Sequence, residues 1–328
     1  MVGRTATAMA GLAVAALTGA AAYQAGSSDP EGGARSSLTL IAPASPGGGW
    51  DGLARTMQQV LRSEGIVASV QVVNIPGAGG TIGLAGLEDR RGDGQTLMIT
   101  GLVMAGAVEL NDSPVTFEDV TPVAMLTEDY EVMVVPADSE FEDLDGFMQA
   151  WKQDPGGTAI GGGSLGGTDQ LVAGLLAQSG EIDPAELNYI AYPGGGEALA
   201  SLLSGNVAAG FSGYAEFAPQ IDAGKLRALG LSADEPVENV DVPVFPELGY
   251  EGAVLPNWRG VLAPRGLDST ESETIQEILD EMVATDAWAE ALERNQWTDA
   301  YLTGEDFQAY VDTQSEDVIA LLEKLGLL

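Results

Sequence analysis

Residues 38–51 read LTLIAPASPGGGWD and join a short apolar run to a glycine turn and the polar start of a helix. The apolar run predicts a strand, and the residues from Asp51 onward have helical spacing. The same order of extended segment, glycine turn and helix recurs at residues 76–81 (PGAGGT), 161–169 (GGGSLGGTD) and 193–197 (PGGGE). This repeated unit predicts an α/β protein in which helices cover mainly parallel strands.

The alternation of apolar runs and helical segments continues along most of the chain. Residues 269–325 have helical periodicity alone, which predicts a helical tail packed on a finished domain. Strands are expected at residues 38–41, 69–73, 96–100, 132–135, 188–191, 208–212, 227–231 and 260–263, and helices are expected to begin near residues 51, 80, 143, 168, 195 and 215. Strands near 132–136 and 226–232 are interpreted as hinges between lobe 1 (residues 37–135 plus 235–328) and lobe 2 (residues 137–230).

Composition limits the chemistry that the chain can perform. The 328 residues contain 49 Asp and Glu against 13 Lys and Arg, a formal net charge of −36, and neither His nor Cys. A surface with this much negative charge repels phosphate backbones, and nucleic acid is therefore not an expected partner. Without His or Cys there is no Ser-His-Asp triad, thiol nucleophile or thiolate metal site, and we expect neither an enzyme nor a cofactor or metal.

The N-terminus has the pattern of a secretory signal. Arg4 precedes an uncharged run over residues 5–28, and small residues at 20–22 supply a cleavage site. Residues 1–30 are therefore interpreted as a signal peptide and linker, which predicts an extracytoplasmic protein, periplasmic or at the cell surface. The alternative is a leader retained as a membrane anchor.

The glycine turns predict a site for an anion. A glycine turn leaves the first N–H groups of the following helix unpaired, lets a ligand approach the backbone, and adds the positive end of the helix dipole. Each turn could equally be a plain strand-to-helix connection, but four of them favour a shared site. Asp51 and Asp169 are expected to be N-caps, and Ser or Thr beside the turns could cap helices or contact a ligand.

Nucleotide motifs are incomplete. Gly47, Gly49 and Gly52 match the spacing of the dinucleotide fingerprint, but the next strand ends in VVNIP (residues 72–76) and lacks the acid that contacts ribose. No Gly-Lys-Ser/Thr sequence is present, which excludes a Walker A loop. Arg259 opens a predicted strand beside an aromatic residue, and it either reaches the ligand or forms a surface ion pair.

Several segments together resemble one receptor family. PGGGWDGLAR (46–55), NIPGAGGTIG (74–83), DGQTL (93–97), GGGSLGGTD (161–169), AGKLRAL (223–229) and WRGVLAP (258–264) resemble, in family order, the extracytoplasmic solute receptors of tripartite tricarboxylate transporters, the TctC or Bug-type receptors. Many relatives have His two residues after the Thr of the second-lobe loop, where this chain has Gln170. Many also have Asp at the strand end occupied here by residues 211–213.

The resemblance implies a two-lobed periplasmic-binding-protein fold of type II, with a mixed sheet flanked by helices in each lobe. It also implies a monomer that captures a citrate-like di- or tricarboxylate between the lobes and delivers it to a permease of one large and one small subunit. The residues that it places at the ligand, together with their neighbours at the turns, are Ser45, Gly48, Gly49, Asp51, Gly80, Thr81, Ser164, Thr168, Tyr192, Ser212, Gly213, Tyr214 and Arg259. The WRG sequence around Arg259 resembles the tricarboxylate branch, in which Arg259 would suit a third carboxylate.

Two other functions stay open from the sequence. One is a secreted α/β enzyme of the nucleotide-dependent oxidoreductase type, against which the missing ribose acid counts. The other is a binding protein that presents its ligand to a sensor kinase instead of a permease. A binding protein that serves a permease and one that serves a sensor kinase would both work by linkage. A ligand that contacts both lobes only in the closed form shifts the population toward closure.

Overall fold

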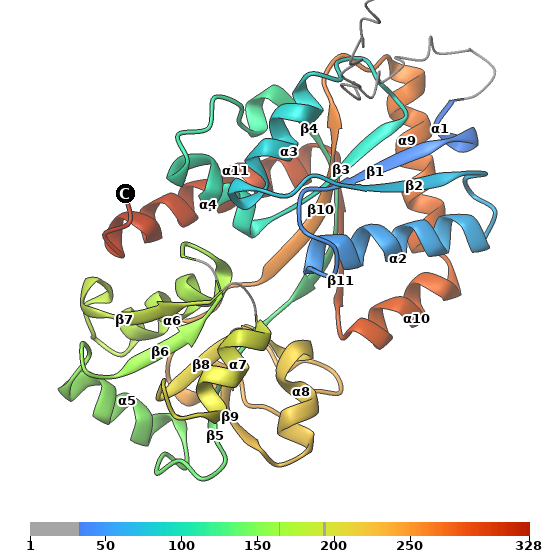
Figure 1. Cartoon of the computed structure of the whole chain (residues 1–328). Coiled ribbons are helices and arrows are strands. Elements are labelled where there is room, and N and C mark those ends of the chain that lie inside the picture. The colour runs from blue at the N-terminus through green and yellow to red at the C-terminus, as the bar shows by residue number, and fades with distance from the viewer. Residues whose placement is uncertain (1–32, 164, 193–194) are drawn as a thin grey trace, which may run out of the picture.

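The computed structural model describes residues 33–163, 165–192 and 195–328, which form two sheets and the helices around them (Figure 1). The signal expected at residues 1–30 lies outside the described residues. The strands of the first sheet are β1 (Leu38–Ala42), β2 (Val70–Asn74), β3 (Thr96–Gly101), β4 (Val120–Asp129), β10 (Asn257–Pro264) and β11 (Thr298–Thr303). Those of the second are β5 (Glu131–Pro136), β6 (Ala159–Gly162), β7 (Asn188–Ala191), β8 (Ala209–Gly213) and β9 (Leu226–Leu231).

Both sheets are mixed, as predicted. The first has the order β11-β4-β10-β3-β1-β2, with β1 parallel to β2 and β3 and with β10 antiparallel to β3 and β4. The second has the order β7-β6-β8-β5-β9, with β6 parallel to β7 and β8 and with β5 antiparallel to β8 and β9. We call the sheets with their helices the first and second lobes.

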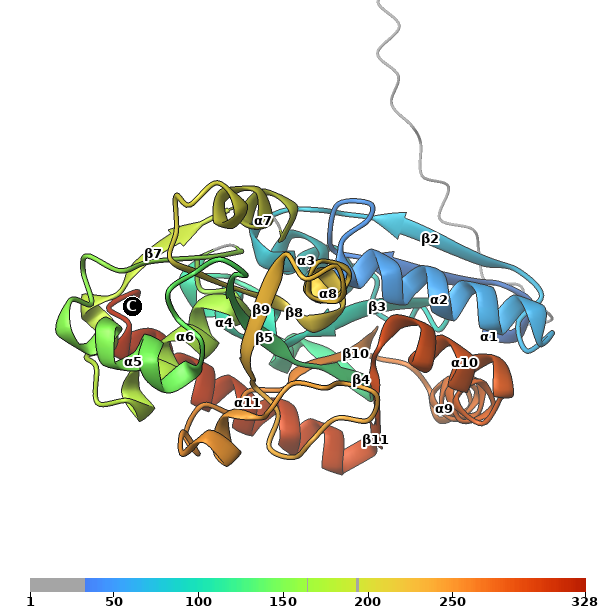
Figure 2. The same ribbon diagram turned by 90° about the horizontal axis from the view of Figure 1, so that it is seen from below.

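Helices cover both faces of each sheet. The helices are α1 (Gly33–Ser36), α2 (Gly49–Ser63), α3 (Thr81–Glu88), α4 (Leu102–Leu110), α5 (Leu144–Gln153), α6 (Thr168–Ser179), α7 (Gly195–Leu203), α8 (Tyr214–Asp222), α9 (Ser269–Val283), α10 (Asp286–Asn295) and α11 (Gly304–Lys324). In the first lobe α2, α9 and α10 pack on one face, and α3, α4 and α11 on the other. In the second lobe α5 and α6 lie on the opposite face from α7 and α8 (Figure 2).

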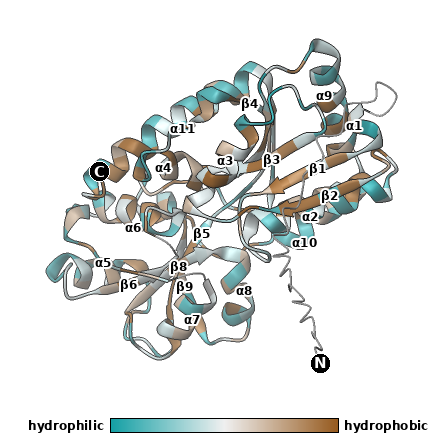
Figure 3. Cartoon of the chain, turned by 45° about the horizontal axis from the view of Figure 1, so that its top comes forward, coloured by the Kyte–Doolittle hydropathy of each residue, from teal (hydrophilic) through white to brown (hydrophobic). Residues whose placement is uncertain are grey.

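The alternation of side chains along the strands explains this layering. Leu40 and Ile41 are both fully buried, yet they belong to different apolar clusters, because successive side chains of a strand point to opposite faces. β1 and β3 are therefore apolar on both faces and are coloured mainly as hydrophobic, whereas α10 contains many hydrophilic residues (Figure 3). Such doubly buried strands are expected where helices cover both faces of a sheet.

The crossovers between the lobes differ from the expected hinges. Strands β5 and β9 pair with each other and lie wholly in the second sheet, so residues 131–136 and 226–231 belong to the second lobe. The first crossover is the single residue Tyr130 between β4 and β5. The second follows β9, and Ser232 accepts a hydrogen bond from the amide of Leu255. Val244 also bridges to Leu231, which places part of the segment 232–256 on the second lobe.

The C-terminal region is not an all-helical tail. β11 pairs with β4 and forms the edge of the first sheet between α10 and α11. Its sequence, TDAYLT, is half-buried and polar, because an edge strand is covered only in part.

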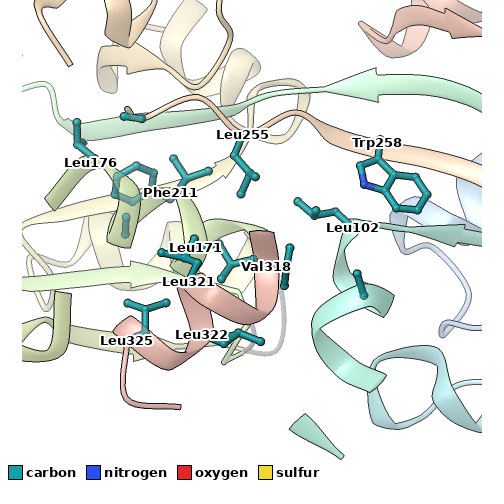
Figure 4. Close-up of a cluster of buried hydrophobic side chains, with 14 of the residues drawn as sticks. Leu102, Leu171, Leu176, Phe211, Leu255, Trp258, Val318, Leu321, Leu322 and Leu325 are labelled. Atoms are coloured by element: carbon teal, nitrogen blue, oxygen red, sulfur yellow. The ribbon is translucent and has the colours of Figure 1, made fainter. Parts of the chain in front are cut away.

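One apolar cluster joins the lobes. Val318, Leu321, Leu322 and Leu325 at the end of the α11 region lie near Leu171 and Phe211 of the second lobe (Figure 4). The same cluster includes Leu102 and Trp258 of the first lobe. The last turns of the chain therefore pack against both lobes.

Candidate functional site

The N-terminus of α2 is capped by a glycine. Gly48 is its N-cap and has no side chain to occupy the first N–H groups, and Gly48 and Gly49 are exposed. By contrast, α5, α9 and α10 are capped by the side chains of Asp143, Asp268 and Thr285. The first amides of α2 are thus free to bind an anion, as the sequence predicts for this turn.

Asp51 braces the turn and is not the expected N-cap. It lies inside α2, and its carboxylate accepts hydrogen bonds of 2.8 Å from the Gly47 amide, the Arg55 Nε and the Asn74 amide. The bond from Arg55, helped by those from Gly47 and Asn74, lowers the pKa of Asp51 to about 2. Because these donors occupy its carboxylate, Asp51 supports the loop and leaves no free charge there.

The second glycine turn lies beside the first. Gly80 is the N-cap of α3 with φ +97°, and an ideal Cβ there would lie 2.8 Å from the Trp50 ring. Only glycine allows both this backbone conformation and the close approach of Trp50. Thr81 is buried, and its hydroxyl donates a 3.0 Å hydrogen bond to the carbonyl of Ala78. The contact of Trp50 with Gly80 brings the two turns of the first lobe together.

Arg259 lies against the first turn. A bulge in the pairing of β10 with β4 falls between Arg259 and Gly260, and bulges redirect side chains. The Arg259 Nη2 lies 3.1 Å from an ideal Cβ on Gly49 and donates a 2.7 Å hydrogen bond to Asp129. Trp297 covers the guanidinium at 5.9 Å from the ring centroid. Arg259 is 8% exposed, and its Nη1 has no hydrogen-bond partner among the described residues.

The second lobe contributes the ends of β6 and β8. Gly213 is the N-cap of α8, again without a side-chain cap, and an ideal Cβ there would lie 3.9 Å from Asp129 Oδ2. Ser212 is buried and donates a 3.0 Å hydrogen bond to Glu216. Thr168 opens α6 behind the N-cap Gly167, and its buried hydroxyl has no partner within the described ranges.

A buried and a partly buried carboxyl group, Glu131 and Asp169, lie next to each other in the second lobe. Asp169 accepts a hydrogen bond from the Gly163 amide, so it braces the third glycine turn and is not an N-cap. Burial, reinforced by Glu216 and Asp129, raises the pKa of Asp169 to about 6. Burial and the charges of Asp169 and Asp129 raise the pKa of Glu131 well above its ordinary value.

The remaining predicted residues have varied settings. Ser45 is exposed and its carbonyl accepts from Gly48, and Ser164 lies outside the described residues. Tyr192 bonds through its hydroxyl to Ser201, and Tyr214 packs against the apolar cluster around Phe217. Of the predicted residues, Gly49 lies against Arg259, and Gly213 lies near Asp129, the hydrogen-bond partner of Arg259.

Sequence reasoning missed Asp129, Glu131 and Trp297. Glu131 stands directly before the apolar run 132–135, so an acid at the start of a buried strand was the available signal. Trp297 comes beside Arg259 only because β11 joins the sheet, which the sequence did not reveal.

Within residues 33–163, 165–192 and 195–328, no group of three or more Asp or Glu is arranged to hold a metal ion. Among these same residues, no helix combines the length and the apolar character that crossing a membrane requires.

Comparisons with known proteins give matches over most of the chain. The model of the family described as tripartite tricarboxylate transporter family receptor matches residues 53–327. Protein BugT of Bordetella pertussis is 29% identical over 295 residues, covering 88% of this chain and 89% of that protein. A crystal structure of a TctC solute-binding protein from Polaromonas is 26% identical with a TM-score of 0.72, covering 88% of this chain and 98% of the other. The R. palustris protein Rpa4515 with adipate has the same fold, with 20% identity, a TM-score of 0.77, and coverage of 88% and 97%.

Proposed function

Because this chain belongs to the tripartite tricarboxylate transporter receptor family, whose members bind solutes and are not enzymes, we propose that it captures a di- or tricarboxylate between its lobes. The supporting observation is the buried Arg259, whose Nη1 lacks a described partner beside the uncapped start of α2. A guanidinium and free helix amides together suit a carboxylate. The relative bound to adipate supports a ligand of this class.

Capture would follow from the position of Arg259 near the crossover. It is joined to Asp129, which is one residue from Tyr130 and close to Gly213 of the second lobe. A carboxylate on Arg259 therefore lies where the two lobes meet, and closure would add contacts from Thr168 and Ser212. Because those contacts exist only in the closed form, binding favours closure.

The family supports a location outside the cytoplasm and delivery of a citrate-like solute to a permease of one large and one small subunit. The permease would recognise the closed receptor. Because ligand binding favours closure, the amount of bound ligand would set the concentration of closed receptor that can deliver it. Deletion of the gene should then abolish uptake of the ligand, and unchanged uptake would contradict delivery.

Calorimetry of the purified chain tests the carboxylate proposal. Citrate, tricarballylate, succinate and malate are titrated, with glucose as the neutral comparison. At least one carboxylate should bind, and Arg259→Lys should weaken its binding by about tenfold or more, because Lys keeps a charge for Asp129 but loses the fork. Arg294→Gln, which removes an exposed charge near the end of α10, is the control and should bind normally. Binding of glucose alone, or normal binding by Arg259→Lys, would contradict the proposal.

A further inference from the structure

One edge of the first sheet is uncharged over three neighbouring strands. Residues 36–50, 65–87 and 94–108 contain β1, β2, β3 and the turns after them, and they have no Asp, Glu, Lys or Arg, although 19% of the chain is charged. The three strands are adjacent and parallel, so the turns that follow them lie at the same edge of the sheet. We call the turns at residues 43–50 and 75–82 the neutral edge.

Burial does not explain why the neutral edge lacks charge. Residues 45–49 and 76–79 are exposed, and the Ile82 side chain in the first turn of α3 is 54% exposed. Exposed positions are where charged residues normally lie. An exposed isoleucine among exposed glycines is therefore unusual on a protein with a net charge of −36.

The opposite edge of the same sheet carries the charge that the neutral edge lacks. There β1, β2, β3 and β4 begin, and β10 ends because it runs antiparallel to β3. The charged residues in the segments at this edge are Arg35, Arg62, Glu64, Glu88, Asp89, Arg90, Arg91, Asp93, Glu118, Asp119, Arg265 and Asp268. The two edges of one sheet thus differ sharply in charge.

The acids nearest to the neutral edge have partners. Asp51 is 2% exposed and is paired with Arg55 at 2.8 Å. Toward β4, Asp129 is paired with Arg259 at 2.7 Å, and Glu128 accepts hydrogen bonds from two tyrosine hydroxyls. An exposed acid, Asp299, comes only on β11, at the far side of the sheet from β2.

The second lobe does not have such an edge. Glu197 and Glu216 are both exposed, and they lie in the first turns of α7 and α8, which follow β7 and β8. An anion that approached Arg259 over the second lobe would meet these two acids. An anion that approached over β1, β2 and β3 would meet exposed glycines and Ile82.

Local charge decides which route an anion takes. Salt screens charges beyond about 8 Å at physiological ionic strength, so an anion near the surface responds to the nearest side chains more than to the net charge. We propose that the neutral edge is the surface over which an anionic ligand approaches Arg259, so that its carboxylate lands on the first lobe before the second lobe closes. This inference rests on the proposed function and adds the route and the order of capture.

A charge placed on the neutral edge tests the route. Association of the carboxylate that binds tightest among citrate, tricarballylate, succinate and malate is followed by stopped-flow fluorescence. At an ionic strength of about 0.01 M, Ile82→Glu should slow association about threefold relative to Ile82→Gln, the effect of one charge about 10 Å from a dianion in water. The difference should disappear at about 1 M salt, where the screening length is about 3 Å. Both variants should fold, because Ile82 is exposed and an acid suits the first turn of a helix.

Matched variants separate the route from the overall charge and from the second lobe. Thr270→Glu adds the same charge in the first turn of α9, on the side of the first lobe away from the second lobe (Figure 1), and should associate like the wild type. Ile190→Glu adds it on β7 of the second lobe, where Ile190 is 37% exposed, and should slow association less than Ile82→Glu. Equal slowing by Ile82→Glu and Thr270→Glu, or slowing that persists at about 1 M salt, would overturn the route. Equal slowing by Ile82→Glu and Ile190→Glu would overturn the order.

Tryptophan quenching tests the route without any carboxylate. Of the five tryptophans, only Trp50, beside Gly80, and Trp297, beside Arg259, are not fully buried. Iodide should therefore quench Ile82→Glu less than Ile82→Gln, whereas neutral acrylamide should quench both equally. Equal quenching by iodide would overturn the route. If no carboxylate binds but iodide distinguishes the two variants, the proposed function fails while the approach surface stands.

Discussion

Replacing Asp51 by Asn tests whether the first glycine turn depends on one carboxylate. Asp51 is 2% exposed and accepts hydrogen bonds from Gly47, Arg55 and Asn74. A fall of its pKa from 3.8 to about 2 corresponds to about 2 kcal/mol of folding stability at neutral pH, from ~1.4 kcal/mol per pKa unit. Asp51→Asn keeps an oxygen for Gly47 but loses the charge that Arg55 binds.

The pH dependence has a definite sign. A carboxyl group with a lowered native pKa contributes stability above its ordinary pKa and loses it as the pH falls toward the native value. Urea unfolding should therefore show Asp51→Asn about 2 kcal/mol less stable than the wild type at pH 7, with the difference shrinking between pH 4 and pH 2.

The control variant is Asp286→Asn, which removes an exposed acid in the first turn of α10 and should cost no more than about 0.5 kcal/mol. A difference for Asp51→Asn that stays the same from pH 7 down to pH 2 would refute the reasoning, since it could not arise from ionisation. Equal losses for the two variants would refute it too, because burial and three hydrogen bonds would then count for nothing.

Three further predictions concern the site. The pKa of Asp169 is raised to about 6, so the protonated carboxyl stabilises the fold below pH 4 and that contribution is lost as the pH rises through 6. In urea titrations, the free energy of unfolding of Asp169→Asn should therefore rise relative to that of the wild type between pH 4 and pH 7, and a difference that stays constant over this range would contradict the prediction. Gly49→Ala should weaken carboxylate binding, because the added Cβ would push on Arg259. Gly52→Ala, whose Cβ would meet open space, should bind normally and raise the free energy of unfolding by ~0.5–1 kcal/mol. Equal affinities for the two variants would show that the guanidinium position is unimportant. Thr168→Val should not destabilise the free protein, because its hydroxyl has no described partner, but should weaken binding in calorimetry; unchanged affinity would remove Thr168 from the site.

Local patterns predicted much of the fold. The strands expected at 38–41, 96–100 and 188–191 match β1, β3 and β7 within a residue or two, because each is a short apolar run ended by a turn. β4 was missed since Pro122 and alternating polar residues interrupt its sequence VTPVAMLTED. β6 was missed because its sequence AIGG reads as part of the glycine turn, and α4 because LVMAGAVEL is apolar all round and lacks a helical stripe.

The site was predictable where backbone chemistry defines it and not where distant segments meet. Glycines at 48, 49 and 80 predict an anion site from the sequence alone, because a helix start leaves its first amides accessible where the residues around it are small. The pairing of Arg259 with Asp129 joins residues 130 positions apart, and it arises only because β4 and β10 are neighbours. The acid at 131 reads as a solvated strand end until burial shows otherwise.

The shared core around α11 has a practical consequence for the urea unfolding experiments above. Residues near the C-terminus pack with both lobes in one continuous cluster, so unfolding of one lobe removes apolar contacts from the other. Loosening of either half exposes the Leu322 and Leu325 contacts of the other, which couples the two halves into one cooperative transition. A single midpoint can therefore report ligand occupancy at the site, and clipping the final turn should split that transition in two.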